Sequence, residues 1–127
     1  MTVFVPEMPQ LIRASVDYLE QELLPTLAGY QRFHTRVCVN VLRIVLRQLE
    51  QGAALEADEW ARLRELLGAQ DSSQPLDALN LRLMDALDDG SLPLDAPGLV
   101  PHLRATLQAA LRINNPQWIP PDDTTAA

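Results

Sequence analysis

Four arginines between positions 32 and 47 have the residue types and spacing best suited to chemistry in this sequence. Arg32, Arg36, Arg43 and Arg47 recur at helical spacing and share one polar strip with Asn40. Guanidinium groups bind phosphate and carboxylate oxygens bidentately, so Arg32, Arg36 and Asn40 form a candidate anion site. The alternatives are a partner interface, solvation, or ion pairs with acids of adjacent helices: Glu20, Glu22, Glu56, Asp58 and Glu59.

A further candidate is His34, which falls on the apolar side of the same helix. A histidine there is commonly a core residue whose ring nitrogens are satisfied by backbone or by a polar neighbour. At the wall of a cleft it would instead be the internal candidate for general acid–base catalysis near neutral pH. His102 is expected at the exposed edge of a later helix. The candidate ligand-binding residues are therefore Arg32, His34, Arg36 and Asn40.

Several kinds of chemistry are excluded by residue type. The chain has no lysine, which rules out Schiff-base catalysis. The single Cys38 cannot form an internal disulfide, and we expect it to be a small buried apolar residue. There is no G-x-S-x-G motif or phosphate-binding glycine loop, and two histidines without a carboxylate motif do not indicate a metal site. The sequence therefore predicts no catalytic residue, no metal and no cofactor.

About five helices are expected to position these residues, because apolar side chains recur at helical spacing in five segments and no alternating strand pattern occurs. The second segment begins at position 28 or 29 and the fifth at position 99. The five segments are expected to end at Pro25, Gly52, Gly68, Gly90 and Asn114. The sequence thus predicts an all-α bundle with a long second helix.

The second segment is apolar around most of its circumference, which is unusual for a surface helix. One broad face holds Tyr30, Phe33, Val37, Val41, Ile44 and Val45, and the other side adds Val39, Leu42, Leu46 and Leu49. We therefore expect a central helix that is covered by the other helices or by a partner chain. Val41 and Ile44 are its expected core residues.

The length of 127 residues is typical of one domain. We expect a compact helical domain over residues 1–119 and a disordered tail over residues 120–127, which lack apolar periodicity. The polar loop at 69–74 is expected to be mobile. Trp118 and Ile119 are expected to pack on the core or on a neighbouring subunit, and with the apolar second helix they predict a homodimer.

The net charge of −7 argues against nucleic-acid binding. Residues 28–52 carry four arginines against one glutamate and lie between two acidic segments, a distribution that favours internal pairing. No apolar stretch is long enough to span a membrane, and the N-terminal residues lack the features of a secretory signal. We therefore expect a cytoplasmic protein that binds neither nucleic acid nor membrane.

Two parts of the sequence carry a family resemblance. The run YLEQELLPTLAGYQRFHTRVCVNVLRIVLRQLEQG and the later HLRATLQAALRINNPQW resemble an uncharacterised bacterial family of small helical proteins, a domain of unknown function. Its members are typically encoded beside acyl-CoA dehydrogenases and kinase-like proteins related to aminoglycoside phosphotransferases. The resemblance implies a link to acyl-CoA or fatty-acid catabolism, with one of those enzymes as a possible partner, and it brings no established activity.

Three functions follow in order of preference. The first is a non-enzymatic accessory or interaction protein that forms a homodimer. The second is a small-ligand binder that holds a phosphate or carboxylate through the arginine row. The third is an enzyme that uses His34.

Overall fold

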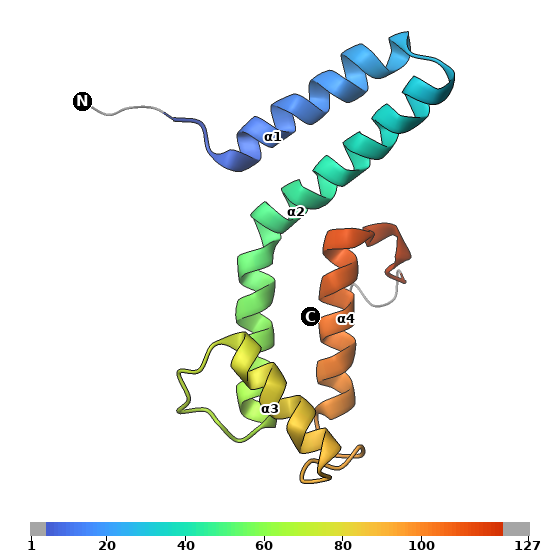
Figure 1. Cartoon of the computed structure of the whole chain (residues 1–127). Helices are drawn as coiled ribbons and strands as arrows, with labels where there is room; N and C mark the ends of the chain where they lie inside the picture. The colour runs from blue at the N-terminus through green and yellow to red at the C-terminus, as the bar shows by residue number, and fades with distance from the viewer. Residues whose placement is uncertain (1–4, 121–127) are drawn as a thin grey trace, which may run out of the picture. The chain divides into compact units, whose positions relative to one another are not determined.

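The chain folds into helices only, as the computed structural model of residues 5–120 shows (Figure 1). The elements are α1 (Met8–Asp17), the π-helical η1 (Tyr18–Leu23), the 3-10 helix η2 (Leu24–Thr26), α2 (Gly29–Leu66), α3 (Leu76–Asp88), α4 (Leu99–Asn114) and the 3-10 helix η3 (Pro116–Trp118). The chain is 77% helical, and the described residues contain no strand. The all-α prediction is confirmed, with four α-helices in residues 5–120 where about five were expected.

The difference in helix number arises at Gly52, where the predicted stop is wrong. α2 continues through this position to Leu66 and joins the expected second and third helices. A glycine ends a helix by adopting a left-handed conformation, as Gly68 does after α2 with a φ of 65°. Gly52 is not among the glycines with positive φ. The strong helix formers that follow it, beginning with Ala53 and Ala54, outweigh the cost of about 1 kcal/mol for one glycine.

The chain divides into two compact units, Met1–Gly52 and Ala53–Ala127, and each is described by itself. The expected single domain over residues 1–119 stays a prediction. Of the expected tail, residues 121–127 lie outside the described part of the chain. Among the described residues, no helix combines the length and apolar character that crossing a bilayer requires.

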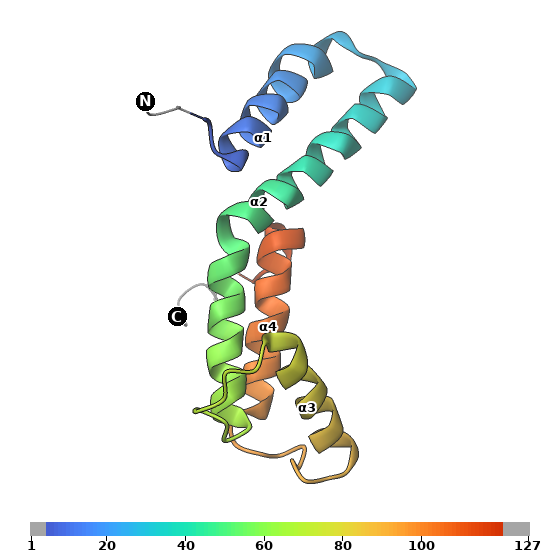
Figure 2. The ribbon, with the colours of Figure 1, turned by 60° about the vertical axis from the view of Figure 1, so that its left-hand side comes forward.

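The first unit is a helical hairpin, in which α1 and η1 lie beside the first part of α2 (Figures 1 and 2). Val16 of α1 and Val39 of α2 are its buried apolar residues. Two ion pairs join the two arms: Arg13 with Glu50, and Arg43 with Glu20 at 2.5 Å. α1 therefore covers one side of α2 and contributes charges at the edge of that contact.

The second unit contains the last part of α2, α3 and α4 around a leucine core. Its fully or nearly buried members are Leu63, Leu79, Leu83 and Leu99. Trp60 packs at the edge of this core, and its indole Nε1 donates a hydrogen bond of 2.8 Å to the backbone oxygen of Gln74. Because Gln74 belongs to the loop between α2 and α3, this bond holds the loop against α2.

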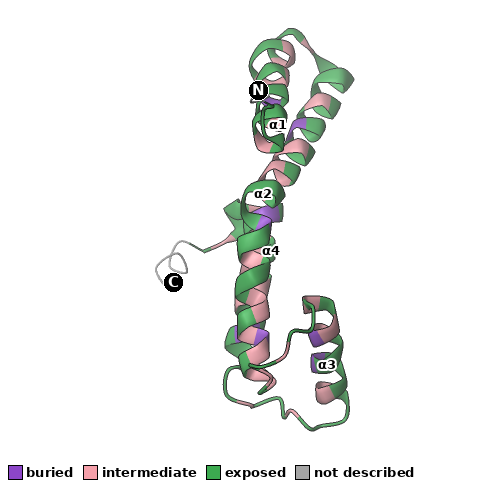
Figure 3. Ribbon diagram, turned by 90° about the vertical axis from the view of Figure 1, so that its left-hand side faces the viewer, coloured by how far each residue is buried: buried purple, intermediate pink, exposed green. Residues whose placement is uncertain are grey.

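The burial pattern bears on the expectations for four residues (Figure 3). Val41, an expected core residue, is 52% exposed, and Cys38 is exposed instead of buried. Trp118, expected to pack on the core or on a neighbouring subunit, is 73% exposed and so does not pack into the chain's own core. His102, expected at an exposed edge, is 4% exposed. Val41 and Cys38 are exposed because the first part of α2 is apolar on two sides and α1 covers only one of these sides.

Candidate functional site

The arginine row of α2 is partly occupied by internal ion pairing. Arg43 donates to Glu20 over 2.5 Å, which agrees with one of the acidic partners expected from the sequence. Arg32 and Arg36 are exposed and lie one helical turn apart. No acidic residue among positions 5–120 forms an ion pair with either of them. These two guanidinium groups therefore remain available to an external anion.

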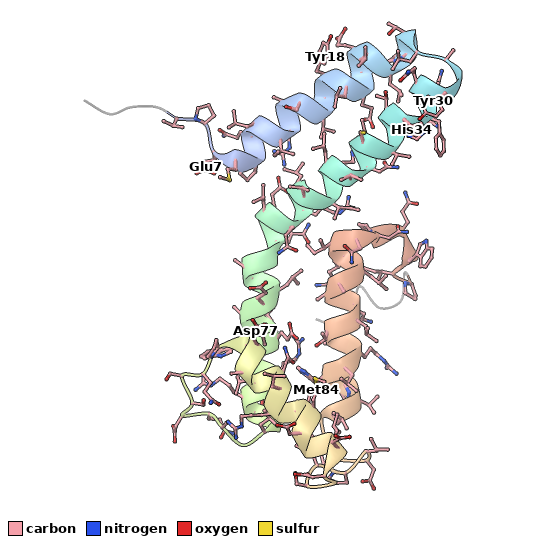
Figure 4. All side chains as sticks on the ribbon, viewed as in Figure 1. Glu7, Tyr18, Tyr30, His34, Asp77 and Met84 are labelled. Carbon is pink, nitrogen blue, oxygen red and sulfur yellow. The ribbon has the colours of Figure 1, made fainter. Side chains whose placement is uncertain are left out.

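His34 and Asn40 complete the candidate set, and both are exposed. The imidazole of His34 packs against two aromatic neighbours, with ring centroids 4.1 Å from Tyr30 and 5.3 Å from Phe33. Figure 4 shows Tyr30 and His34 together near the start of α2. Helical geometry separates His34 from Arg36 by about 160° around the helix axis. The fold thus brings Arg32, Arg36 and Asn40 to one side of α2 and His34 to the other.

His34 sits within an exposed apolar surface on the side of α2 that faces away from α1. We call this surface the α2 stripe, and its side chains are 41–72% exposed. The α2 stripe consists of Tyr30, Phe33, Val37, Val41, Val45 and Leu49. The sequence predicted that the other helices or a partner chain would cover these residues, and the described residues of the chain leave them exposed.

The second unit holds a histidine that the sequence interpretation did not select. His102 is buried at the start of α4, and none of the described residues is a hydrogen-bond partner of its Nδ1. Burial lowers the pKa of His102, the positive charge of Arg62 lowers it further, and Glu59 acts in the opposite direction. The neutral imidazole is therefore favoured in the folded protein. A signal for this burial existed in the sequence, since His102 lies three residues after the core residue Leu99 on the same helix.

Metal binding has little support in the described part of the chain. No group of three or more histidine, cysteine, aspartate or glutamate side chains there could hold a metal ion. The described residues offer two candidates, apolar association through the α2 stripe and anion binding by arginine.

The fold and this surface define a class of protein: an all-helical protein with an exposed apolar helix face. The model of one family, described as a domain of unknown function (DUF6285), matches residues 25–118. The chain belongs to this family, and the match includes the whole of α2, α3 and α4. Neither a curated protein nor a solved structure shows significant similarity to the chain.

Proposed function

We propose that this chain is a non-enzymatic interaction protein that forms a homodimer through the α2 stripe. The observation that carries the proposal is the exposure of six large apolar side chains in one continuous row on α2. Apolar patches of this kind on a protein surface usually mark an interface.

The spacing of the α2 stripe fits a second copy of the same chain. Phe33, Val37, Val41, Val45 and Leu49 follow one another at intervals of four residues, so the row is symmetric about Val41. In a two-fold interface each residue meets the residue at the mirrored position of the other copy. An antiparallel pair of α2 helices would place Val41 beside its own copy and Val37 opposite Val45, so that apolar side chains meet throughout.

The charges of α2 also favour a protein partner of the same kind. The first part of α2 carries Arg32, Arg36, Arg43, Arg47 and Glu50, all at least about 120° from Val41 around the helix axis. Two copies that meet at the α2 stripe would therefore keep these charged side chains of α2 away from the interface, although each chain has a net charge of −7. A membrane-surface helix needs basic residues flanking its apolar face, and here they lie on the far side.

The size of the α2 stripe sets the expected affinity of the dimer. Two aromatic and four aliphatic side chains at these exposures offer roughly 500 Å² per copy, so a dimer would bury about 1,000 Å², the lower end for specific interfaces. We therefore expect reversible dimerisation with a dissociation constant in the micromolar range.

The first prediction tests this dimer. Sedimentation velocity of the wild type should show mass rising from monomer to dimer as the concentration increases through the micromolar range. Val41→Glu should remain monomeric over the same range, because it places two carboxylates beside the two-fold axis. The matched control is Val100→Glu, an equally exposed valine on α4, which should dimerise like the wild type.

Cross-linking tests the orientation. In a Cys38→Ser background, Val41→Cys should form a disulfide-linked dimer under mild oxidation, whereas Val100→Cys should not. A wild type that stays monomeric throughout the micromolar range, or equal cross-linking of the two variants, would contradict the proposal.

The family resemblance supplies the proposed setting. We place the dimer in the bacterial cytoplasm as an accessory to acyl-CoA or fatty-acid catabolism, with an acyl-CoA dehydrogenase or kinase-like protein encoded beside it as its heterologous partner. Titration calorimetry of the purified chain with that enzyme should show heat of binding. Absence of binding by both neighbouring enzymes would remove this setting and leave the homodimer proposal to its own test.

A second candidate function is anion binding by Arg32 and Arg36, favoured by their exposure and by the absence of an ion pair to either of them within residues 5–120. As the second prediction, a bound phosphate or carboxylate compound should raise the free energy of unfolding by about 2.7 kcal/mol at a hundredfold excess over its dissociation constant. Arg36→Ala should abolish this gain without changing the stability of the free protein. A thermal-shift panel of acyl-CoAs, CoA, fatty acids and nucleotides measures both. No shift with any compound would reject this function.

A further inference from the structure

The centre line of the α2 stripe also carries residues that are not apolar. Helical geometry places Tyr30, His34, Gln48 and Gly52 within about 20° of Val41 around the helix axis. His34 lies seven residues before Val41, and Gln48 lies seven residues after it. Tyr30 and Gly52 lie eleven residues before and after it. The line is therefore symmetric about Val41 in these four positions as well as in its valines.

The first of these mirror pairs joins two polar side chains. In the antiparallel pair proposed above, His34 of one copy lies opposite Gln48 of the other. Both side chains are exposed in the single chain, and the dimer would bury them. A buried polar group costs free energy unless it is hydrogen-bonded. A neutral imidazole and an amide each have a donor and an acceptor, so each residue supplies the partner that the other needs.

The second mirror pair joins a large side chain to a residue without one. Tyr30 is 72% exposed, and the position opposite it on the other copy is Gly52. A glycine inside a helix costs about 1 kcal/mol, and Gly52 does not have the positive φ that would require glycine. Because glycine has no Cβ, a ring can approach the backbone closely there. Contact with Tyr30 of the other copy gives this glycine a reason.

The two mirror pairs are neighbours on both copies. Tyr30 and His34 stand one helical turn apart, and their ring centroids are separated by 4.1 Å. Gln48 and Gly52 are also one turn apart, and the amide end of Gln48 lies over Gly52. In the dimer, a movement of this amide toward His34 would open the space that Tyr30 enters. The two-fold axis would repeat the cluster at the other end of the α2 stripe.

We infer that these two mirror pairs fix the register of the α2 dimer and restrict the α2 stripe to a second copy of this chain. Valine and leucine alone would also face one another after a shift of one turn. Such a shift would place His34 opposite Ile44 or Gly52 and leave its imidazole buried without a partner, as a foreign apolar helix would. The inference rests on the proposed homodimer and adds the residues that make it specific.

A charge exchange tests the polar pair. His34→Glu should weaken dimerisation about tenfold or more, and so should Gln48→Lys, because each places an unpaired charge in the interface twice. The double variant His34→Glu/Gln48→Lys should recover a dissociation constant within about threefold of the wild type. The two positions are about 21 Å apart along α2. They therefore cannot pair within one chain, and neither a parallel nor a shifted dimer brings them together.

The matched control for the charge exchange is His34→Glu/Gln117→Lys. It makes the same two charge changes but places the positive charge on the exposed Gln117 of η3. This control should dimerise as weakly as His34→Glu alone. Sedimentation equilibrium gives all the dissociation constants, and circular dichroism verifies that each variant is helical.

A size exchange tests the second pair. Gly52→Leu should weaken dimerisation about tenfold, because the leucine fills the space that Tyr30 enters, while leucine itself favours the helix. Addition of Tyr30→Ala should restore most of the affinity, since the double variant exchanges the large and the small side of the pair.

The outcomes distinguish this inference from the homodimer proposal. A wild type that stays monomeric throughout the micromolar range contradicts both. A wild-type dimer in which His34→Glu/Gln48→Lys is no tighter than the Gln117 control overturns the inference and leaves the homodimer standing. Single variants that dimerise as the wild type does would also overturn it. Recovery of affinity in both double variants is the expected result, and failure of the size exchange would overturn the role of Tyr30 and Gly52.

Discussion

Two histidines of one chain have opposite surroundings, and that difference decides what each can do. His34 is exposed between Tyr30 and Phe33, with no carboxylate hydrogen-bonded to it among the described residues. Such an imidazole has no group to orient it as a general base. His102 is buried beside the positive charge of Arg62 and lines a cavity, and its neutral form is favoured there. The residue with unusual chemistry is therefore His102.

The third prediction concerns the pH dependence that His102 imposes on stability. Its pKa is lowered in the folded state by burial and by Arg62, so between the folded and unfolded pKa values the unfolded chain binds the extra proton. The free energy of unfolding should therefore be constant above a pH of about 6.5, for this group, and fall as the pH decreases below it.

The measurement is urea unfolding of the wild type and His102→Gln from neutral pH down to about pH 5. The loss of stability on acidification should be smaller in the variant, because it lacks the imidazole whose pKa is lowered in the folded state. His34→Gln serves as the control and should follow the wild type. Parallel curves for the wild type and His102→Gln would show that His102 is protonated equally in the two states.

At the scale of the element, two glycines that look alike in sequence have opposite roles in the helices. Gly52 lies inside α2 with ordinary helical backbone, whereas Gly98 precedes α4 with a φ of 87°. An alanine in place of Gly52 would keep the helical backbone conformation that alanine prefers. An alanine in place of Gly98 must adopt a left-handed conformation, which costs about 1–2 kcal/mol for residues with a Cβ.

The fourth prediction is a pair of effects with opposite sign. Gly52→Ala should raise the free energy of unfolding by about 0.5–1 kcal/mol, since the added Cβ meets the flexible amide end of Gln48, which can move aside. Gly98→Ala should lower it by about 1–2 kcal/mol, although its Cβ would meet Leu66 Cδ1 at an ordinary 3.8 Å. Chemical denaturation measures both. Destabilisation by Gly52→Ala would indicate that α2 is interrupted there.

At the scale of the whole molecule, apolar burial is concentrated in a small number of residues. Among the described positions, the buried apolar side chains are Val16, Val39, Leu63, Leu79, Leu83, Leu99 and Ile113. Many other large apolar residues are exposed, those of the α2 stripe included. The stability of the isolated chain therefore depends strongly on the few leucines of the second unit, and association offers a further source of burial.

The fifth prediction compares two leucines of α3. Leu79 is 0% exposed in the core and Leu81 is 62% exposed. Leu79→Ala should lower the free energy of unfolding by about 2–5 kcal/mol, through lost transfer energy and a cavity. Leu81→Ala should change it by no more than about 0.5 kcal/mol. Similar losses for both variants in urea unfolding would show that α3 is packed differently from this arrangement.

The sequence alone determined the helical class, most helix ends and the polar strip of α2. These follow from local rules: apolar side chains three and four residues apart define a helix face, and α4 spans the expected Leu99–Asn114. The pairing of Arg43 with Glu20 was also within reach, because opposite charges on neighbouring helices attract. The helix end expected at Gly52 was wrong, because a glycine that ends a helix and a glycine inside a helix look the same in the sequence.

Only the tertiary structure decided which apolar faces are covered. Periodicity predicted that Val41 and Cys38 would be buried, and their exposure depends on α1 covering only one side of α2. Trp118 was expected to pack on the core or on a neighbouring subunit, and the described residues of the chain leave it exposed. The burial of His102 and its approach to Arg62 arise from contact between residues 40 positions apart. Burial is a property of the neighbours that a folded chain brings to a face, and local residue spacing contains no information about which neighbours those are.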